Sequence, residues 1–267
     1  MSNQCFFLPV GDLADARVDT ELSLDGPEGH HAVTVKRVHA GELIDLVDGT
    51  GVRAVVEVVA TQKSSLTAVV RALDVEAAPA VGITLIQALA KGDRDLQAVE
   101  SAVELGISAV RPWQSDRAIV RWNEAKASKA IGKWESTVLS ALKQSRRTFL
   151  PAVLPMLTTG ALAKDIEERT GSATPTLVLI LHERGTAPLA QVIDQWLDAN
   201  PALRDAEGTT RGEIQLVVGP EGGISDAELE KFMAAGAQVA LLGQHVLRAS
   251  TAGPAALVLT RHLLGQL

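Results

Sequence analysis

The sequence has few of the residues that build disulfides, membrane anchors or aromatic clusters. Its 267 residues include one cysteine, Cys5, and no tyrosine. A single cysteine cannot form an intramolecular disulfide or a cysteine-rich metal site, which suits a reducing compartment. The adjacent His30 and His31 point in different directions in an extended chain and have no other clustered ligands, so we expect no bound metal. No apolar run approaches the roughly 18 residues that span a bilayer, and no basic leader precedes a long apolar segment at the start. These absences predict a soluble, cytoplasmic protein with no membrane partner.

The composition that remains is that of a folded protein with an uneven charge distribution. With 46% apolar and 21% charged residues, the chain can form one large or two modest domains with real cores, which excludes disorder. The formal net charge of −7 argues against a uniformly basic nucleic-acid binder. Between residues 111 and 147, however, nine lysines and arginines accompany three acidic residues, a local +6 that leaves −13 elsewhere. A segment of this kind can contact RNA phosphates.

The first part of the chain, residues 1–75, has the pattern of a small β domain. Its expected strands are the valine-rich runs 43–47, 52–59 and 66–73. The turn at 48–51, Asp-Gly-Thr-Gly, tolerates positive φ and predicts an antiparallel hairpin between the first two runs. Small residues, a proline and a glycine then mark residues 76–82 as a linker.

Residues 83–267 alternate short apolar strands with helical patterns, which is typical of a parallel sheet covered on both faces. The expected strands are residues 83–89, 109–112, 176–181, 214–218 and 239–242. Apolar spacing predicts helices around residues 96–103, 131–142 and 189–196. Ser225 and Glu228 form a capping-box pattern that starts another helix, which Gly236 ends. Small residues in the last helix, 252–256, allow close approach of its backbone.

Two glycine-containing loops follow strands of this second domain. The first is Gly219-Pro220-Glu221-Gly222-Gly223, at the sheet edge where open α/β folds bind ligands. It can also be read as a tight turn only, and it lacks the spacing of a P-loop or a dinucleotide fingerprint. The second loop, residues 242–252, carries one permanent charge, Arg248. Taken alone, Arg248 is more typical of a surface ion pair than of a substrate contact.

Together these segments closely resemble the ribosomal RNA small subunit methyltransferase E family of the SPOUT class. The matching residues are Gly219 to Gly223, Leu242-Gly243, Leu247-Arg248, Thr251-Ala252, and upstream 87–94, 104–106 and 144–147, with His31, Val35, Arg37 and Gly41 near the start. The resemblance covers nearly the whole chain. One departure is Ser250, where many members carry glutamate, which weakens any role for a carboxylate at that position.

The resemblance implies an α/β fold with a C-terminal SPOUT-type, trefoil-knotted parallel-sheet domain, 83–267, and an N-terminal PUA-like β-barrel, 1–75, that binds RNA. It further implies a homodimer whose site both subunits complete, with S-adenosylmethionine as cofactor. Backbone groups and aliphatic side chains of tight loops can hold adenine, so no tyrosine or rich aromatic set is required. The implied cofactor-binding residues are Leu181, His182, Glu183, Gly219, Pro220, Glu221, Gly222, Gly223, Leu242, Gly243, Val246, Leu247, Ser250, Thr251 and Ala252.

The reaction implied by the resemblance is methyl transfer to N3 of a uridine in small-subunit (16S) ribosomal RNA. Arg248 could stabilise a developing uracil oxyanion. Glu221 and His182 are candidate bases, and each can equally be structural: Glu221 as an acceptor within its turn, His182 as the end of a strand. The expected RNA contacts are Lys36, Arg37, Lys91, Arg94, Gln144, Arg146 and Arg147. The alternative is a non-catalytic RNA-binding or ribosome-assembly factor, which Ser250 motivates.

Overall fold

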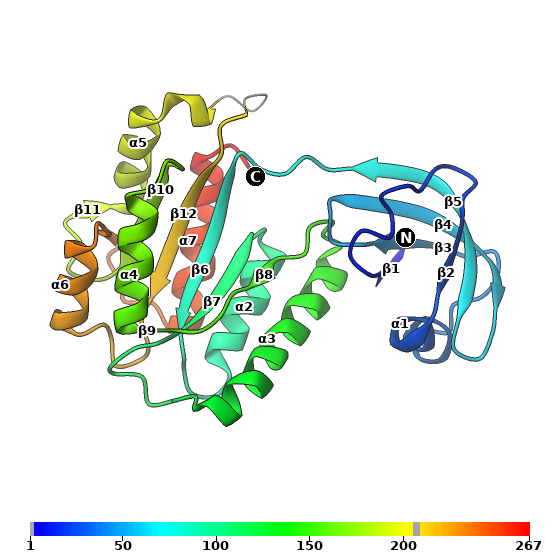
Figure 1. Cartoon of the computed structure of the whole chain (residues 1–267), viewed down its shortest axis with the longest axis horizontal. Helices are drawn as coiled ribbons and strands as arrows, with labels where there is room; N and C mark the ends of the chain where they lie inside the picture. The colour runs from blue at the N-terminus through cyan, green and yellow to red at the C-terminus, as the bar shows by residue number, and fades with distance from the viewer. Residues whose placement is uncertain (1–2, 205–208) are drawn as a thin grey trace. The chain divides into compact units, whose positions relative to one another are not determined.

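A computed structural model describes residues 3–204 and 209–267, and they form two compact units (Figure 1). The first unit is the described part of Met1–Ala78 together with Leu139–Leu150, and the second comprises Pro79–Val138 and the described part of Pro151–Leu267. The division falls close to the expected linker at 76–82. Residues 139–150 belong to the first unit, although the sequence pattern places them in the second domain.

The first unit is built on one five-stranded sheet in the order β1-β3-β4-β5-β2. Its strands are β1 (Gln4–Phe7), β2 (Glu21–Leu24), β3 (Leu43–Val47), β4 (Val52–Thr61) and β5 (Leu66–Val75). The predicted antiparallel pairing of β3 with β4 is confirmed. The two edge strands, β1 and β2, were not predicted, because each has four residues and too few alternations to show a period of two.

A short helical segment of the first unit contains the residues of the His31 to Gly41 pattern. Helix α1 (Gly26–His30) continues into a wide helical turn, η1 (His31–Val35), where the ring of His31 meets Phe6 edge to face at a centroid distance of 6.1 Å. The segment ends at Arg37, whose φ of 56° is left-handed. Lys36 and Arg37 are exposed at this end.

The first unit also holds the end of a long helix, α3 (Glu124–Ser145), and the residues that follow it. Phe149 forms an antiparallel bridge with Thr50 at the β3–β4 hairpin. A Cβ on Gly51 would lie 2.5 Å from the Phe149 ring, so the glycine permits this contact. Lys143 Nζ lies 2.6 Å from Glu28 Oε1, and this ion pair compensates one charge of the basic segment.

The second unit contains an eight-stranded sheet in which every pairing is parallel (Figure 1). The order is β11-β13-β10-β12-β6-β7-β8, and β9 pairs with β7. The strands are β6 (Val81–Ala88), β7 (Ala109–Gln114), β8 (Ala152–Val153), β9 (Leu157–Thr158), β10 (Thr176–Leu181), β11 (Ala187–Pro188), β12 (Gly212–Val218) and β13 (Gln238–Leu241). The five predicted strands are confirmed, each to within two residues at either end.

Helices cover both faces of this sheet, as predicted (Figure 1). One face is covered by α2 (Arg94–Glu104), α5 (Leu189–Ala199) and α7 (Ala249–Leu263), with the short η2 (Pro201–Arg204) after α5; the other by α4 (Thr159–Thr170) and α6 (Asp226–Ala234). A Cβ on Gly253 of α7 would lie 2.7 Å from Leu85, which confirms the close approach expected of the last helix. On the opposite face, Trp113 meets Phe232 edge to face at 5.4 Å.

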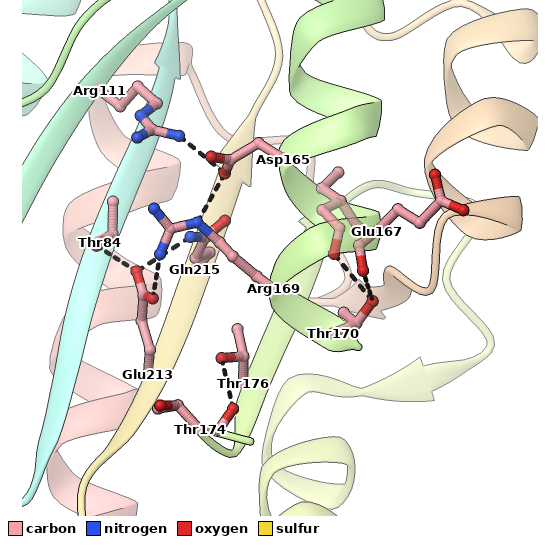
Figure 2. A network of polar contacts seen from close by, with 11 residues as sticks. Thr84, Arg111, Asp165, Glu167, Arg169, Thr170, Thr174, Thr176, Glu213 and Gln215 are labelled. Carbon is pink, nitrogen blue, oxygen red and sulfur yellow. Dashed lines mark hydrogen bonds and ion pairs between the residues drawn. The ribbon is translucent and has the colours of Figure 1, made fainter. Parts of the chain in front are cut away.

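A network of charged side chains lies between α4 and the sheet (Figure 2). Asp165 Oδ2 lies 2.8 Å from Nη1 of Arg111 and 2.8 Å from Nε of Arg169. Arg169 Nη1 reaches Glu213 Oε2 at 2.6 Å, and the other oxygen of Glu213 accepts hydrogen bonds from Thr84 and Gln215. Burial lowers the pKa of Arg169, but Glu213 and Asp165 outweigh it, and the net shift is upward. The network is therefore charge-balanced within itself.

The network removes Arg111 from the basic segment that sequence composition suggested for RNA binding. Its side chain is 8% exposed and is paired with Asp165. Alternation along β7 turns Arg111 and Trp113 to the same face, under α4, where a cation needs a carboxylate partner. Arg111 is not among the RNA contacts expected from the sequence, and its pairing with Asp165 lowers the charge that the segment can offer to RNA.

Candidate active site

Three of the loops singled out in the sequence lie at one edge of the parallel sheet. β10 pairs with β12 on one side and with β13 on the other, and all three strands run in the same direction. The loops that follow them, residues 182–186, 219–225 and 242–248, therefore lie side by side at the carboxyl edge. This is the edge at which open α/β sheets bind ligands.

The glycine turn, defined as residues 219–223, is shaped by two of its glycines. A Cβ on Gly219 would lie 2.7 Å from Cγ1 of Ile224, so the chain folds back on itself here. Gly223 has a φ of +70°, which a side chain would strain. The predicted capping box of Ser225 and Glu228 is confirmed, and it starts α6 immediately after the turn. The close packing at Gly219 and the capped start of α6 therefore fix the two ends of the turn.

Glu221 connects the glycine turn to the loop after β6. Its Oε1 accepts a hydrogen bond from the Lys91 backbone N–H at 3.2 Å and lies 2.9 Å from Nη1 of Arg94. Burial raises the pKa of Glu221, but hydrogen bonds from the backbone and from Arg94 outweigh it and hold the pKa below its usual value. A general base for neutral pH needs a raised pKa, so the structural reading of Glu221 is favoured. Arg94 is engaged by the same pair.

His182 fixes the loop after β10 against its neighbours. The side chain is 7% exposed, and Nδ1 accepts a hydrogen bond from the Arg184 backbone N–H at 3.1 Å, which leaves the proton of a neutral ring on Nε2. The His182 backbone N–H donates to the carbonyl of Ala240 at 3.2 Å. These contacts also favour a structural role for His182. Glu183 beside it is exposed.

Gly185 is a residue of this edge that sequence reasoning missed. A Cβ there would lie 2.7 Å from the backbone of Ala240 and Leu241, so the loop after β10 packs directly on the end of β13. The signal was a glycine four residues beyond a predicted strand. Arg184, next to it, forms an ion pair with Asp226 of α6 at 2.7 Å. This pair joins the loop after β10 to the start of α6, which follows the glycine turn.

The loop after β13 presents apolar side chains and one cation. Val246 is 83% exposed and Leu247 is also exposed, while a Cβ on Gly243 would meet open space. Arg248 occupies the N-cap position of α7, and its carbonyl accepts the backbone N–H groups of Thr251 and Ala252. No carboxylate among the described residues lies within 4 Å of its guanidinium. Leu242 and Ser250 are half-buried, as is Leu181 at the end of β10.

The expected RNA contacts are divided between the two units. Lys36, Arg37, Gln144, Arg146 and Arg147 belong to the first unit. Lys36, Arg37 and Gln144 are exposed, whereas the two arginines of the 144–147 cluster are half-buried. Lys91 and Arg94 belong to the second unit and follow β6 at the carboxyl edge. Of these two, Lys91 is the more exposed.

Two further structural findings bear on the class of site. Among the described residues, no helix is both long enough and apolar enough to cross a membrane. In the same part of the chain, no three histidine, cysteine, aspartate or glutamate side chains gather closely enough to hold a metal ion.

Comparison with known proteins agrees with the fold. Residues 77–261 match the RNA methyltransferase domain, and residues 24–71 match the RNA methyltransferase PUA domain. The fold and the sheet edge thus define an RNA methyltransferase with an N-terminal PUA domain. Ribosomal RNA small subunit methyltransferase E of Mycobacterium tuberculosis is 37% identical over 236 residues, which are 88% of this chain and 83% of that protein. The chain belongs to the ribosomal RNA small subunit methyltransferase E family.

More distant relatives and a solved structure are similar over most of their length. The enzyme of the same name from Bacillus subtilis is 25% identical over 232 residues, which are 86% of each chain. The crystal structure of ribosomal RNA small subunit methyltransferase E from Neisseria gonorrhoeae, bound to S-adenosylmethionine, superposes with a TM-score of 0.79. It is 28% identical and covers 98% of both chains.

Proposed function

We propose that this chain transfers a methyl group from S-adenosylmethionine to N3 of a uridine in 16S ribosomal RNA. The observation that carries the proposal is the arrangement of β13, β10 and β12 as parallel neighbours, which brings the three implied cofactor loops to one edge. Family membership supports the reaction class. The trefoil knot implied by the resemblance remains a prediction.

The residues at this edge fit the proposed cofactor. When bound, S-adenosylmethionine supplies an electrophilic methyl group on a sulfonium. The open space beside Gly243 leaves the backbone accessible, and the exposed side chains of Val246 and Leu247 offer apolar surface for an adenine ring. The bent glycine turn, residues 219–223, offers the backbone groups of three glycines, Gly219, Gly222 and Gly223, which carry no side chains of their own. The remaining residues proposed to bind it are those implied above, from Leu181 to Glu183 and from Ser250 to Ala252.

N3 of uridine carries a weakly acidic proton and must become electron-rich before it can attack. Positioned donors that stabilise negative charge on the neighbouring uracil oxygens favour that state. Arg248 suits this role, because it is exposed at the edge and no described carboxylate pairs with it. Glu221 is engaged by Arg94, and His182 is mostly buried. The proposed catalytic residue is therefore Arg248, and no side chain is assigned as the base.

The proposed partners follow from the same assignment. The substrate is small-subunit ribosomal RNA, free or in the assembled subunit, and the first unit contacts it through Lys36, Arg37 and the 144–147 cluster. The protein acts in the cytoplasm as a homodimer. Sedimentation of the purified chain tests the dimer, and a mass of one chain at micromolar concentration would contradict it.

A calorimetric measurement of cofactor binding and an assay of methyl transfer test the proposed function. We expect the folded chain to bind S-adenosylmethionine and to transfer its methyl group to small-subunit RNA purified from cells that lack the protein. Absence of binding would contradict the enzyme. Binding of RNA without methyl transfer would support the second candidate, a non-catalytic ribosome-assembly factor, for which Ser250 in place of the common glutamate is the supporting feature.

A further inference from the structure

A loop that no motif singled out lies against the glycine turn. This β7 loop, defined as residues 115–123, follows β7 at the carboxyl edge and contains no helix or strand. It carries two exposed arginines, Arg117 and Arg121, and between them Ile119, which is 67% exposed. An exposed loop with two cations and a bare aliphatic side chain beside a candidate active site calls for a functional explanation.

Glu228 fixes the position of the β7 loop. Its side chain is buried, with the residue 1% exposed, and Oε1 accepts hydrogen bonds from the Asp116 backbone N–H and the Thr159 hydroxyl, both at 2.7 Å. Oε2 accepts from the backbone N–H and hydroxyl of Ser225 at 2.9 and 3.0 Å. One carboxylate therefore joins the β7 loop to the starts of α4 and α6. Burial raises the pKa of Glu228, but these donors outweigh it and lower the pKa.

Arg117 sits directly on the glycine turn. A Cβ on Gly222 would lie 3.2 Å from the carbonyl oxygen of Arg117 and 3.3 Å from its Cβ, and Nη1 of Arg117 donates to the Gly222 carbonyl at 3.3 Å. Nη2 of Arg121 turns back to the Asp116 carbonyl at 2.8 Å. Each guanidinium has five N–H donors, so most of them are left for a ligand.

The charge of these arginines is not compensated as that of Arg94 is. Arg94, on the other side of the turn, pairs with Glu221. Within the part of the chain that the structure describes, no carboxylate lies within 4 Å of the guanidinium of Arg117 or Arg121. Two guanidinium groups held in place without carboxylates suit a phosphate, whose oxygens accept paired N–H donors from the planar guanidinium.

We propose that Arg117, with Arg121 as a second cation, binds a backbone phosphate of the RNA substrate beside the glycine turn, and that Glu228 is the positioning residue for this loop. The proposal rests on the proposed function: a uridine that reaches the cofactor loops must bring its own backbone to this edge, where phosphate contacts fix its register. The carboxylate of S-adenosylmethionine is the competing anion, and measuring cofactor binding beside RNA binding separates the two.

The first test compares Arg117→Ala with Arg204→Ala in the full-length chain. Arg204 lies before β12, at the opposite edge of the sheet, so its variant changes net charge equally. Binding of S-adenosylmethionine is measured by calorimetry, and binding of unmethylated small-subunit RNA by filter binding at several salt concentrations. For Arg117→Ala we expect roughly tenfold weaker RNA binding, a salt slope reduced by about one, and cofactor affinity within about twofold. Arg204→Ala should match the wild type.

The outcomes separate this proposal from the function on which it rests. If the wild-type chain transfers no methyl group, the proposed function fails. If the wild type is active and Arg117→Ala keeps wild-type RNA affinity, the phosphate site is refuted. Weaker cofactor binding with unchanged RNA affinity would assign Arg117 to the cofactor carboxylate instead, and would also refute the site.

The second test isolates the role of Glu228. Glutamine can still serve as the capping-box residue at the start of α6, but Glu228→Gln removes the negative charge that accepts the hydrogen bond from the Asp116 backbone N–H of the β7 loop. We expect Glu228→Gln to weaken RNA binding in the wild type and to add no further loss in Arg117→Ala, because it acts through Arg117. An equal loss in both backgrounds would contradict the positioning role.

The Arg117→Lys variant keeps the positive charge but lacks the planar, forked donors of a guanidinium. It should therefore keep the salt slope of the wild type but not the full RNA affinity.

Discussion

The face of the parallel sheet that α4 covers and the carboxyl edge of the same sheet hold the same kinds of charged residue in opposite arrangements. Under α4, Arg111 and Arg169 are paired with Asp165 and Glu213 (Figure 2). At the carboxyl edge, Arg117, Arg121 and Arg248 are exposed, and no described carboxylate lies within 4 Å of any of them. The paired arginines stabilise the fold, whereas the exposed arginines are available to an anionic substrate.

The comparison explains why a count of basic residues is a poor guide to an RNA surface. Arg111, Lys133 and Lys143 all fall in the basic segment, and all three are engaged by carboxylates within their own unit. A cation contributes to RNA binding when its charge is not already compensated. The following variants test each side of the comparison in turn.

Asp165→Ala should have the largest effect, because it leaves Arg111 buried without a carboxylate. Breaking a buried pair from one side typically costs about 3 to 5 kcal/mol, and we expect the free energy of unfolding to fall by that order in a denaturant titration. Lys164→Ala, one residue earlier and exposed on α4, is the control and should change stability by less than about 0.5 kcal/mol. Equal stability of the two variants would mean that the network contributes nothing to the fold.

Gly222→Val should abolish binding of S-adenosylmethionine while the fold is kept. The Cβ of the new side chain would lie 3.2 Å from the carbonyl oxygen of Arg117, and its methyl groups would cover the backbone of the glycine turn. We expect affinity at least about a hundredfold lower by calorimetry, a loss of about 2.7 kcal/mol. Gly160→Val is the matched control, since a Cβ on Gly160 meets open space. Normal affinity of Gly222→Val would refute the placement of the cofactor.

Arg147→Glu should weaken RNA association about tenfold and leave cofactor binding unchanged, because the residue belongs to the first unit. Filter binding at several salt concentrations measures the effect. Arg71→Glu makes the same charge change in the same unit, at a residue outside the 144–147 cluster. If the two variants lose the same RNA affinity, the 144–147 cluster has no special role in the footprint.

The smallest expected effect concerns pH. The pKa of Glu228 is lowered in the folded protein, so its contribution to stability is present above the unfolded value near 4.5 and is lost as pH falls through the folded pKa. We expect Glu228→Gln to be less stable than wild type at pH 7, by about 1 to 2 kcal/mol, with the gap narrowing as the pH falls below about 4.5. A stability difference between the two proteins that does not change with pH would show that ionisation of Glu228 does not stabilise the folded state.

Much of the second unit could be predicted from the sequence, because its strands are continuous apolar runs and its helices have clear starts. β10 and the capping box of Ser225 and Glu228 are examples. Helix α4 was not predicted: Gly160 and a run of charged residues obscure its apolar face, although Thr158 caps its start. That helix carries Asp165 and Arg169, so the charge network was missed with it.

The candidate site was predictable where glycines and family motifs marked it, and not where distant residues supply the contacts. The glycine turn and the loop after β13 are of the first kind. The bond from Glu228 to the β7 loop joins positions 112 residues apart in the sequence, and the tie from Glu221 to Arg94 joins positions 127 apart. The capping-box pattern gave Glu228 a complete local explanation, so nothing in the sequence pointed to its second role.

The most direct test of the account is to map methylated nucleotides by mass spectrometry in small-subunit ribosomal RNA from cells with and without this protein. The account predicts that one uridine loses a methyl group on N3 when the protein is absent and regains it when the wild type, but not Gly222→Val, is restored. Identical methylation of the ribosomal RNA in both cells would contradict it.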